Sequence, residues 1–320
     1  MKIVITGSAG FIGFHLTKSL IQDGHEIIGI DSINNYYNQN LKLDRIKLLK
    51  TNKNFSFKKI DICDKLELCK VFQDFKPERV VNLAAQPGVR YSIINPDAYV
   101  ASNLIGFVNI LEACTKNDVE GLIYASSSSV YGSNNEIPFK EENKTSKPIS
   151  LYGATKGANE LIANAYNNIY GLKITGLRFF TVYGTWYRPD MAIYIFTDKI
   201  NNGDTIKVFN HGKMRRDFTF IDDIVAGTKS AIEKNYEKEI FNLGKNKSEE
   251  LLEVIAIIEN ELGKKAKIKL LPIEPGDVIE TYANIAHSQL KLGYQPKISI
   301  QQGIPKFVNW FKDYHAWTTL

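Results

Sequence analysis

The sequence predicts an α/β fold, a doubly wound parallel sheet followed by a smaller C-terminal α/β domain. Three observations lead to this prediction. Apolar runs that suit buried strands alternate with segments of helical periodicity over about the first 180 residues. The first apolar run is followed at once by a glycine-rich turn. Polar or small residues close most of the predicted strands, which is typical of a sheet whose carboxyl edge binds a ligand.

Composition places the chain among ordinary globular proteins. It has 320 residues, 44% hydrophobic and 23% charged, and its net charge of +5 comes from 40 basic and 35 acidic side chains spread along the chain. Because no basic arm is concentrated anywhere, we expect no nucleic-acid partner. The apolar runs are short and the chain starts with a strand rather than a signal peptide. We therefore expect no membrane partner and a cytoplasmic location.

The cysteines and histidines give no sign of a metal site. Cys63, Cys69 and Cys114 are odd in number and share no CxxC spacing, so neither a disulfide framework nor a zinc site is suggested. The five histidines lie far apart in the sequence. We expect no bound metal and reduced cysteines that serve packing.

The first 31 residues read as strand, turn, helix and strand. Gly7 permits a tight turn, Gly10 lets the backbone approach a pyrophosphate, and Gly13 allows close packing of the helix that follows. The free amides at the start of that helix face the anion. Asp31 closes the second strand, 18 positions after Gly13, and its carboxylate is placed to accept hydrogen bonds from ribose hydroxyls. A carboxylate there repels a 2′-phosphate, so NAD is favoured over NADP.

The next hundred residues continue the alternation. Helices are predicted at 41–50, 64–74 and 96–116, and strands at 55–61 and 77–85. The second of these strands ends in the small residues Ala84 and Ala85, which leave room for the backbone of a cofactor. The loop at 86–92 breaks at Pro87 and Gly88 and carries Arg90, which is placed either to reach a sugar or to form a salt bridge.

The stretch from 125 to 156 carries the candidate chemistry. Tyr152 and Lys156 are four residues apart, so they share one face of a helix. A lysine ammonium beneath a phenol stabilises phenolate, so we expect the pKa of Tyr152 to fall from about 10 toward neutrality. Ser127 ends a buried strand that begins at 121 and can hydrogen-bond the same substrate oxygen. Together the three side chains predict proton transfer at a hydroxyl.

Beyond the reactive helix the pattern changes. A sixth strand is predicted at 172–180, and the segment 181–190 is then rich in aromatic and turn-forming residues. From there the helices and short strands follow no strict βαβ order, which indicates a smaller substrate domain. Asp217, Asp222 and Asp223 are read as turn and helix-start carboxylates rather than metal ligands.

Taken in order, these features resemble the extended short-chain dehydrogenase/reductases, in the branch of NAD-dependent nucleotide-sugar epimerases. The resemblance covers nearly the whole chain and is carried by the glycine turn, Asp61–Ile62, residues 82–85, Ser127, the Tyr152–Lys156 pair and the segment that begins at Arg178. Within that branch the chain is most similar to UDP-glucuronate 4-epimerases, through residues 31–37, 85–92, 180–184, 188–192, 215–223 and 275–278.

The resemblance implies a function and an organisation. The function is C4 epimerisation of UDP-glucuronate to UDP-galacturonate, by transient oxidation to a 4-keto sugar with bound NAD and within polysaccharide biosynthesis. The implied organisation is a Rossmann domain over 1–181, with a segment at about 217–243 returning to it, and a mainly UDP-sugar-binding domain over 182–320. A homodimer through the helices at 97–116 and 152–170 is also implied.

The predicted site residues fall into three groups. Ser127, Tyr152 and Lys156 are catalytic. The NAD site is predicted to comprise Gly7, Gly10, Phe11, Ile12, Gly13, Asp31, Asp61, Ile62, Leu83, Ala84 and Ala85, with Tyr152 and Lys156. The UDP-sugar site is predicted to comprise Arg90, Ser126, Ser128, Thr181, Arg188, Arg216 and Asp277.

A few positions bear on the alternatives. Ser128 and Ser129 stand where related dehydratases carry an Asp-Glu pair and related decarboxylases a Glu, so neither reaction has its carboxyl group here. Glu274 replaces the phosphate-binding Arg of galactose-type epimerases. Thr185, Tyr187 and Pro87 depart from the glucuronate pattern, where Pro, Gly and Ala are usual. The alternatives are an epimerase acting on UDP-glucose or UDP-N-acetylglucosamine and, less favoured, an NAD-sensing protein without catalysis.

Overall fold

A seven-stranded parallel sheet forms the larger part of the molecule, which confirms the predicted fold class. The computed structural model describes residues 1–134, 136–274 and 278–318. The strand order is β11-β6-β5-β4-β1-β2-β3, and every neighbouring pair is parallel. The strands are β1 (Lys2–Thr6), β2 (Glu26–Asp31), β3 (Phe55–Lys59), β4 (Arg79–Asn82), β5 (Gly121–Ser127), β6 (Ile174–Phe179) and β11 (Lys238–Leu243).

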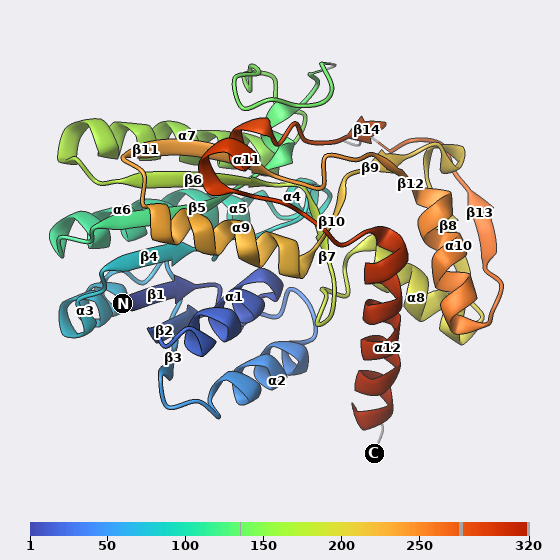
Figure 1. The fold of residues 1–320 in the computed structure, drawn as a ribbon, viewed down its shortest axis with the longest axis horizontal. Helices are drawn as coiled ribbons and strands as arrows, with labels where there is room; N and C mark the ends of the chain where they lie inside the picture. Colours follow the sequence, from blue (N-terminus) through green and yellow to red (C-terminus); the bar gives the residue numbers. More distant parts are fainter. Residues whose placement is uncertain (135, 275–277, 319–320) are drawn as a thin grey trace.

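Helices cover both faces of this sheet (Figure 1). One layer contains α1 (Phe11–Gln22), α2 (Gln39–Leu49) and α9 (Ile221–Lys234), and the other contains α3 (Lys65–Phe75), α6 (Gly106–Lys116) and α7 (Leu151–Tyr170). Along β1, Ile3 and Ile5 pack into the first layer and Val4 into the second. Because both faces are buried, the strand is apolar at each of the three positions 3–5 rather than at alternate ones.

The predicted helix at 96–116 is continuous but not uniform. It consists of α5 (Pro96–Tyr99), a π-helical turn at Val100–Ile105 and α6. By length and composition the stretch Pro96–Lys116 passes the test for a helix that crosses a membrane, and half of its most apolar part is buried inside the molecule. Core helices of globular proteins pass the same test, so the result is weak evidence for a membrane span.

A smaller lobe contains most of the chain after 180. Short strands pair as β7 (Thr181–Tyr183) with β10 (Phe218–Phe220), β8 (Thr205–Val208) with β13 (Lys267–Leu270), and β12 (Glu249–Glu250) and β14 (Glu280–Thr281) on either side of β9 (Arg215–Arg216). The helices of this lobe are α8 (Ala192–Asn202), α10 (Leu251–Leu262) and α12 (Ile300–Thr318). Helix α11 (Ala286–Leu292) packs instead on α9 and β11 of the large sheet, and a short α4 (Tyr91–Ile94) lies in the first half of the chain.

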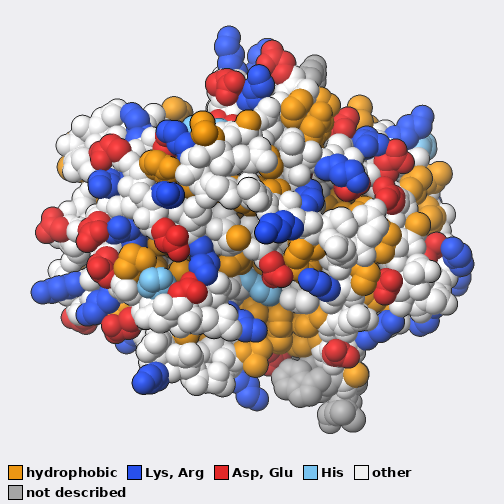
Figure 2. All heavy atoms as spheres, viewed as in Figure 1, with side chains coloured by type: hydrophobic (Ala, Val, Ile, Leu, Met, Phe, Trp, Pro, Cys, Tyr) orange, Lys and Arg blue, Asp and Glu red, His pale blue; other side chains and the backbone are white. Residues whose placement is uncertain are grey.

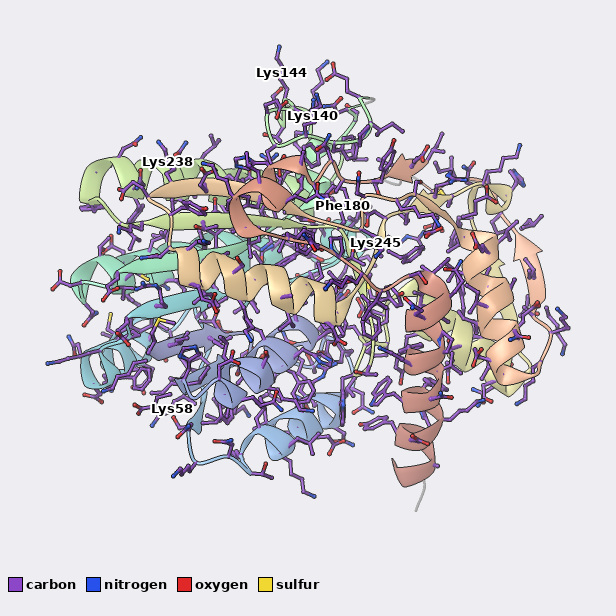
Figure 3. The ribbon with its side chains drawn as sticks, viewed as in Figure 1. Lys58, Lys140, Lys144, Phe180, Lys238 and Lys245 are labelled. Atoms are coloured by element: carbon purple, nitrogen blue, oxygen red, sulfur yellow. The ribbon has the colours of Figure 1, made fainter. Side chains whose placement is uncertain are left out.

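The side chains drawn in Figures 2 and 3 add two points. Figure 2 shows acidic and basic side chains interspersed on the face it presents, with no broad area of one sign. Figure 3 shows Phe180 and Lys245 where the large sheet meets the smaller lobe, and Lys140 and Lys144 on a loop that projects from the molecule. The junction marked by Phe180 is where the cavity described next is found.

Candidate active site

The glycine turn is too crowded for side chains at its two ends. Gly7 has φ +71°, and a Cβ on it would lie 2.7 Å from the backbone nitrogen of Ala84. A Cβ on Gly13 would lie 2.1 Å from the carbonyl oxygen of Gly7. The turn is therefore pressed against both α1 and the segment after β4, as the sequence predicted for a tight turn and a closely packed helix.

Helix α1 starts from this turn without a capping side chain. Its N-cap is Gly10, no side chain accepts a hydrogen bond from the first-turn amides, and no acidic residue lies in that turn. The first amides of a helix need acceptors, and the positive end of the helix dipole favours an anion. This helix start is consequently suited to a diphosphate.

Asp31 lies at the end of β2 beside the turn. Its two carboxylate oxygens accept hydrogen bonds from the backbone N–H of Ala9 at 3.2 Å and of Ile33 at 2.8 Å. Burial raises the pKa of Asp31, and the nearby charge of Lys42 opposes the rise. Lys42, from α2, donates to the side chain of Asn34 at 2.6 Å and lines the same cavity. The carboxylate is thus fixed in place with a cation close to it.

Tyr152 and Lys156 lie in the first two turns of α7. The hydroxyl of Ser150 caps the helix by accepting the N–H of Gly153 at 3.0 Å, so the helix begins at Leu151. Lys156 is 3% exposed, and its Nζ donates to the carbonyl oxygen of Ala125 at 2.8 Å. Burial lowers the pKa of Lys156 to about 8.

The pKa of Tyr152 differs from the sequence prediction. Burial raises it, while a hydrogen bond with the Ser127 hydroxyl and the charge of Arg188 oppose that rise. The ammonium of Lys156 donates to the carbonyl oxygen of Ala125 on β5 rather than to the phenol. Desolvation of a phenolate therefore outweighs the charges that the protein itself supplies.

The serines after β5 have different environments. Ser127 ends the strand, and its Oγ accepts the N–H of Ser129 at 3.2 Å. Ser126 was predicted to bind substrate, but its hydroxyl donates to Oε1 of Glu160 at 2.5 Å. Its neighbours Ser128 and Ser129 line the cavity. Ser129 was not among the predicted site residues, although its position in the run of serines was a signal for a place in the cavity wall.

Arg188 and Arg216 approach the cavity from the smaller lobe. Arg188 makes a bidentate pair with Asp190, with Nε to Oδ1 at 3.0 Å and Nη2 to Oδ2 at 2.5 Å. Oδ2 of Asp190 also accepts the hydroxyl of Tyr36 at 3.1 Å. Nη1 of Arg216 donates to the carbonyl oxygens of Arg215 and Ile279. Both guanidinium groups therefore have a fixed direction.

Of the predicted substrate residues that the structure describes, Arg90 does not line the cavity. Arg90 forms an ion pair with Glu274, Nε to Oε2 at 3.0 Å, and its guanidinium lies 4.4 Å from the centre of the Phe209 ring. Of the two alternatives for Arg90, the structure therefore has the salt bridge. Asp277 lies outside the residues that the structure describes.

The remaining predicted residues come together around one cavity of about 450 Å³ at the carboxyl edge of the sheet. Sequence reasoning missed part of its wall, including Lys42, Phe139 and Met191. The predicted residues that line it are Gly7, Gly10, Phe11, Ile12, Gly13, Asp31, Asp61, Ile62, Leu83, Ala84, Ala85, Ser126, Ser127, Ser128, Tyr152, Lys156, Thr181, Arg188 and Arg216. Within the described ranges, no three His, Cys, Asp or Glu side chains are grouped so as to hold a metal ion.

The chain is similar to known nucleotide-sugar epimerases in both sequence and structure. Residues 3–244 match the model of the NAD dependent epimerase/dehydratase family. UDP-glucuronate 4-epimerase 4 of Arabidopsis thaliana is 44% identical, over 99% of this chain and 76% of its own. The crystal structure of UDP-glucuronic acid 4-epimerase from Bacillus cereus, in complex with UDP-glucuronic acid and NAD, has a TM-score of 0.93 at 34% identity, over 98% of this chain and 100% of that one. UDP-glucose 4-epimerase of Thermotoga maritima, with UDP-glucose, has a TM-score of 0.90 at 30% identity, over 98% and 100%.

Proposed function

Since the chain belongs to the NAD dependent epimerase/dehydratase family, we propose that it inverts C4 of UDP-glucuronate to give UDP-galacturonate. The reaction is an isomerisation with NAD as a cofactor that is not consumed. The observation that carries the proposal is the shared cavity. It brings the glycine turn and Asp31 together with Ser127, Tyr152 and Lys156 in one wall.

The residues present fit NAD. Side chains are excluded at Gly7 and Gly13, which leaves the backbone free to approach a diphosphate, and the uncapped start of α1 lies at the same place. Asp31 would hold the adenosine ribose, and Tyr152 and Lys156 the other end of the molecule. When bound, NAD supplies the acceptor and donor of the C4 hydride and a positive charge beside the phenol.

The reaction begins with removal of the proton from the 4-hydroxyl of the sugar. Tyr152 is the base, because it lies in the cavity wall with Ser127 hydrogen-bonded to it. The Ser127 hydroxyl holds the same substrate oxygen, and Lys156 fixes the end of β5 through Ala125. Loss of hydride from C4 completes the oxidation and leaves a 4-keto sugar.

Inversion requires the sugar to turn while its nucleotide stays in place. Arg216 would hold the diphosphate, because it lines the cavity from β9 and guanidinium groups bind phosphate oxygens well. The keto sugar then rotates about the diphosphate link and presents its other face to the returning hydride. Tyr152 gives the proton back to the new alkoxide, so no proton or electron is lost overall.

A hexuronate adds a hazard, because its 4-keto form is a β-keto acid that tends to lose carbon dioxide. The carboxylate must therefore be held out of the geometry for cleavage. Ser128, Thr181 and Arg188 line the cavity and are the candidates, whereas the hydroxyl of Ser126 is already bound to Glu160. Ser129, beside them, supplies no carboxyl group that could act as an acid or base for dehydration.

The test is to incubate the purified protein with UDP-glucuronate, UDP-glucose and UDP-N-acetylglucosamine separately and to identify each product. We expect UDP-galacturonate from UDP-glucuronate. The assignment is falsified if UDP-glucuronate is left unchanged while either other sugar is epimerised. Tyr187 lines the cavity where the glucuronate pattern has Gly, so the identity of the sugar is the part of the proposal that this comparison decides.

We also propose an organisation for the whole protein. Residues 1–181, with a returning segment at about 217–243, would form the NAD domain, and 182–320 mainly the UDP-sugar domain. A homodimer is proposed through the π-helical turn at Val100–Ile105, α6 and α7, whose exposed apolar residues include Ile105, Leu161 and Ile169. A cytoplasmic location, without nucleic-acid or membrane partners, and a role in polysaccharide biosynthesis complete the proposal.

A further inference from the structure

A row of three buried polar side chains crosses the carboxyl edge of the sheet. Ser126 of β5, Arg178 of β6 and Asn242 of β11 are partners in register on adjacent parallel strands. Partners in register point to the same face of a sheet, so the three side chains lie side by side. All three are buried, and buried polar groups need hydrogen-bond partners.

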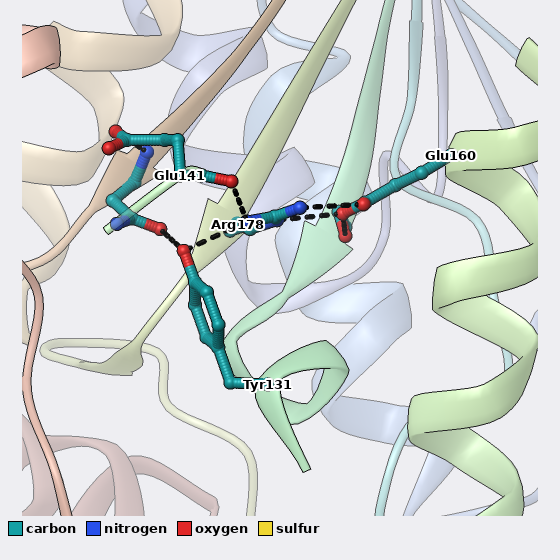
Figure 4. A network of polar contacts seen from close by, with 6 residues as sticks. Tyr131, Glu141, Glu160 and Arg178 are labelled. Atoms are coloured by element: carbon teal, nitrogen blue, oxygen red, sulfur yellow. Dashed lines mark hydrogen bonds and ion pairs between the residues drawn. The ribbon is translucent and has the colours of Figure 1, made fainter. Parts of the chain in front are cut away.

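Glu160 of α7 supplies the partner for two of them. Its Oε1 accepts the Ser126 hydroxyl at 2.5 Å and Nε of Arg178 at 2.9 Å, and its Oε2 accepts Nη2 of Arg178 at 2.8 Å (Figure 4). The side chains of Arg178 and Glu160 are 5% and 12% exposed, so water competes little with this bidentate pair. Glu160 follows Tyr152 and Lys156 on α7 at successive intervals of four residues, and so lies on the same face of the helix.

The other side of Arg178 reaches the cavity wall. Its Nη1 donates to the Tyr131 hydroxyl at 2.9 Å and to the carbonyl oxygen of Glu141 at 3.0 Å. The Tyr131 hydroxyl donates to Asn242 at 2.6 Å, and Nδ2 of Asn242 donates to the carbonyl oxygen of Phe139 at 2.9 Å. The rings of Phe139 and Tyr131 stack at 4.5 Å, and Phe139 lines the cavity.

We propose that Glu160 and Arg178 are positioning residues for the reaction. Through Ser126 they fix the end of β5, and therefore Ser127, against the face of α7 that carries Tyr152. Through Tyr131 they hold Phe139 as a wall of the sugar cavity. Neither Glu160 nor Arg178 is among the residues that line the cavity, so they act through residues that do. Their role therefore rests on the proposed function of Ser127 and Tyr152.

The expected effect is on rate rather than on binding. Loss of the Ser126–Glu160 hydrogen bond frees the residue next to Ser127, while the residues proposed to hold NAD and the diphosphate keep their contacts. A shift of about 1 Å between reacting groups can reduce a rate by about 100-fold. The role therefore predicts a lower kcat with nearly unchanged KM and NAD content.

The experiment compares Ser126→Ala, Tyr131→Phe and Glu160→Gln with the wild type, well below the Tm of each protein. Each should reduce kcat by about 10-fold or more, with KM changed by less than about threefold. The double variant Ser126→Ala/Glu160→Gln should be no slower than Glu160→Gln alone, because Glu160→Gln already disturbs the Ser126–Glu160 contact that Ser126→Ala removes. Glu239→Gln is the control. Glu239 lies on β11, as Asn242 of the network does, but it pairs with Lys291 and His287 and does not line the cavity. It should lower Tm and leave kcat unchanged.

Three results would overturn the proposal. The first is a lower Tm in the test variants with kcat unchanged, which is a purely structural role. The second is a raised KM with kcat retained in Ser126→Ala, which makes Ser126 a substrate ligand. The third is additive losses in the double variant.

If Glu160→Gln fails to fold, Ser126→Ala and Tyr131→Phe decide alone, since each removes one hydroxyl. The assay uses whichever UDP-sugar the wild type converts, so failure with UDP-glucuronate counts against the proposed function only.

Discussion

The side chains of Tyr152 and Lys156 lie in the cavity wall, with Tyr152 half-buried and Lys156 buried, and desolvation shifts their pKa values in opposite directions. The pKa of the phenol is raised and that of the ammonium is lowered to about 8. The spacing of four residues correctly placed both on one face of α7 and in the cavity wall. It could not reveal that Lys156 donates to Ala125, because that acceptor belongs to a strand far along the chain. A cation brought next to the phenol is what would lower its pKa.

Tyr152→Phe tests the role of the phenol. The change removes one hydroxyl and leaves the glycine turn and Asp31 untouched, so bound NAD should be retained. Turnover should fall by at least about 10² to 10⁴-fold, the usual contribution of a general base. The measurement is the rate of UDP-sugar conversion beside the NAD content of the purified variant. A variant that keeps wild-type turnover would remove Tyr152 from the mechanism.

Other residues show where sequence reasoning stops. Ser126 and Ser127 are neighbours of the same type, and only the strand register shows that the first faces Glu160. Arg90 pairs with Glu274, a residue distant in the sequence. The sequence alone therefore could not decide between a sugar contact and a salt bridge for Arg90. The places of Gly7, Gly10 and Gly13, by contrast, were predictable, because the turn that requires them lies within a few residues of the sequence.

At the scale of elements, β4 is shorter than its apolar run suggested, and the residues that follow it line the cavity. The strand was predicted at 77–85 but ends at Asn82. Leu83 and Ala84 leave the ladder where the turn of Gly7 approaches them closely. The π-helical turn at Val100–Ile105 was also unpredicted. Asn103 within it bonds the backbone N–H of Gln86 at 2.7 Å and Thr155 of α7 at 3.1 Å, which ties the loop after β4 to the reactive helix.

Two glycines inside helices offer a matched comparison of these packing constraints. Gly13→Ala places a Cβ against the Gly7 carbonyl, so it should destabilise the protein by about 1–3 kcal/mol and reduce NAD binding. Gly157→Ala on α7 meets nothing within 4 Å and should stabilise the protein by about 0.5–1 kcal/mol. Thermal unfolding of both variants measures the difference. Equal effects in the two variants would contradict the close packing of α1 on the turn.

At the scale of the whole molecule, the site belongs to the junction between the sheet and the smaller lobe. The sheet supplies the glycine turn, Asp31 and Ser127, and the lobe supplies Arg188 and Arg216. The fold class was predictable from alternating patterns. The wall residues Lys42 and Phe139 were not, because the first comes from a solvated-looking helix and the second from an irregular loop.

The proposed homodimer is tested by a charge placed on its expected interface. Leu161 on α7 is 73% exposed, and Leu161→Glu should convert a dimer into a monomer because a buried unpaired carboxylate is costly. Leu290→Glu on α11, where the side chain is 84% exposed, is the control and should leave the assembly unchanged. Analytical ultracentrifugation distinguishes the two. A wild type that sediments as a monomer would remove this interface from the account.

The central claim is that C4 is inverted by hydride transfer within one cavity, and an isotope label at C4 tests it most directly. UDP-glucuronate deuterated at C4 should give UDP-galacturonate that keeps deuterium at C4, with no label in the solvent and no net change in NAD. Loss of the deuterium to water during epimerisation would show that C4 is deprotonated instead, and would contradict the mechanism derived from Tyr152 and the NAD site.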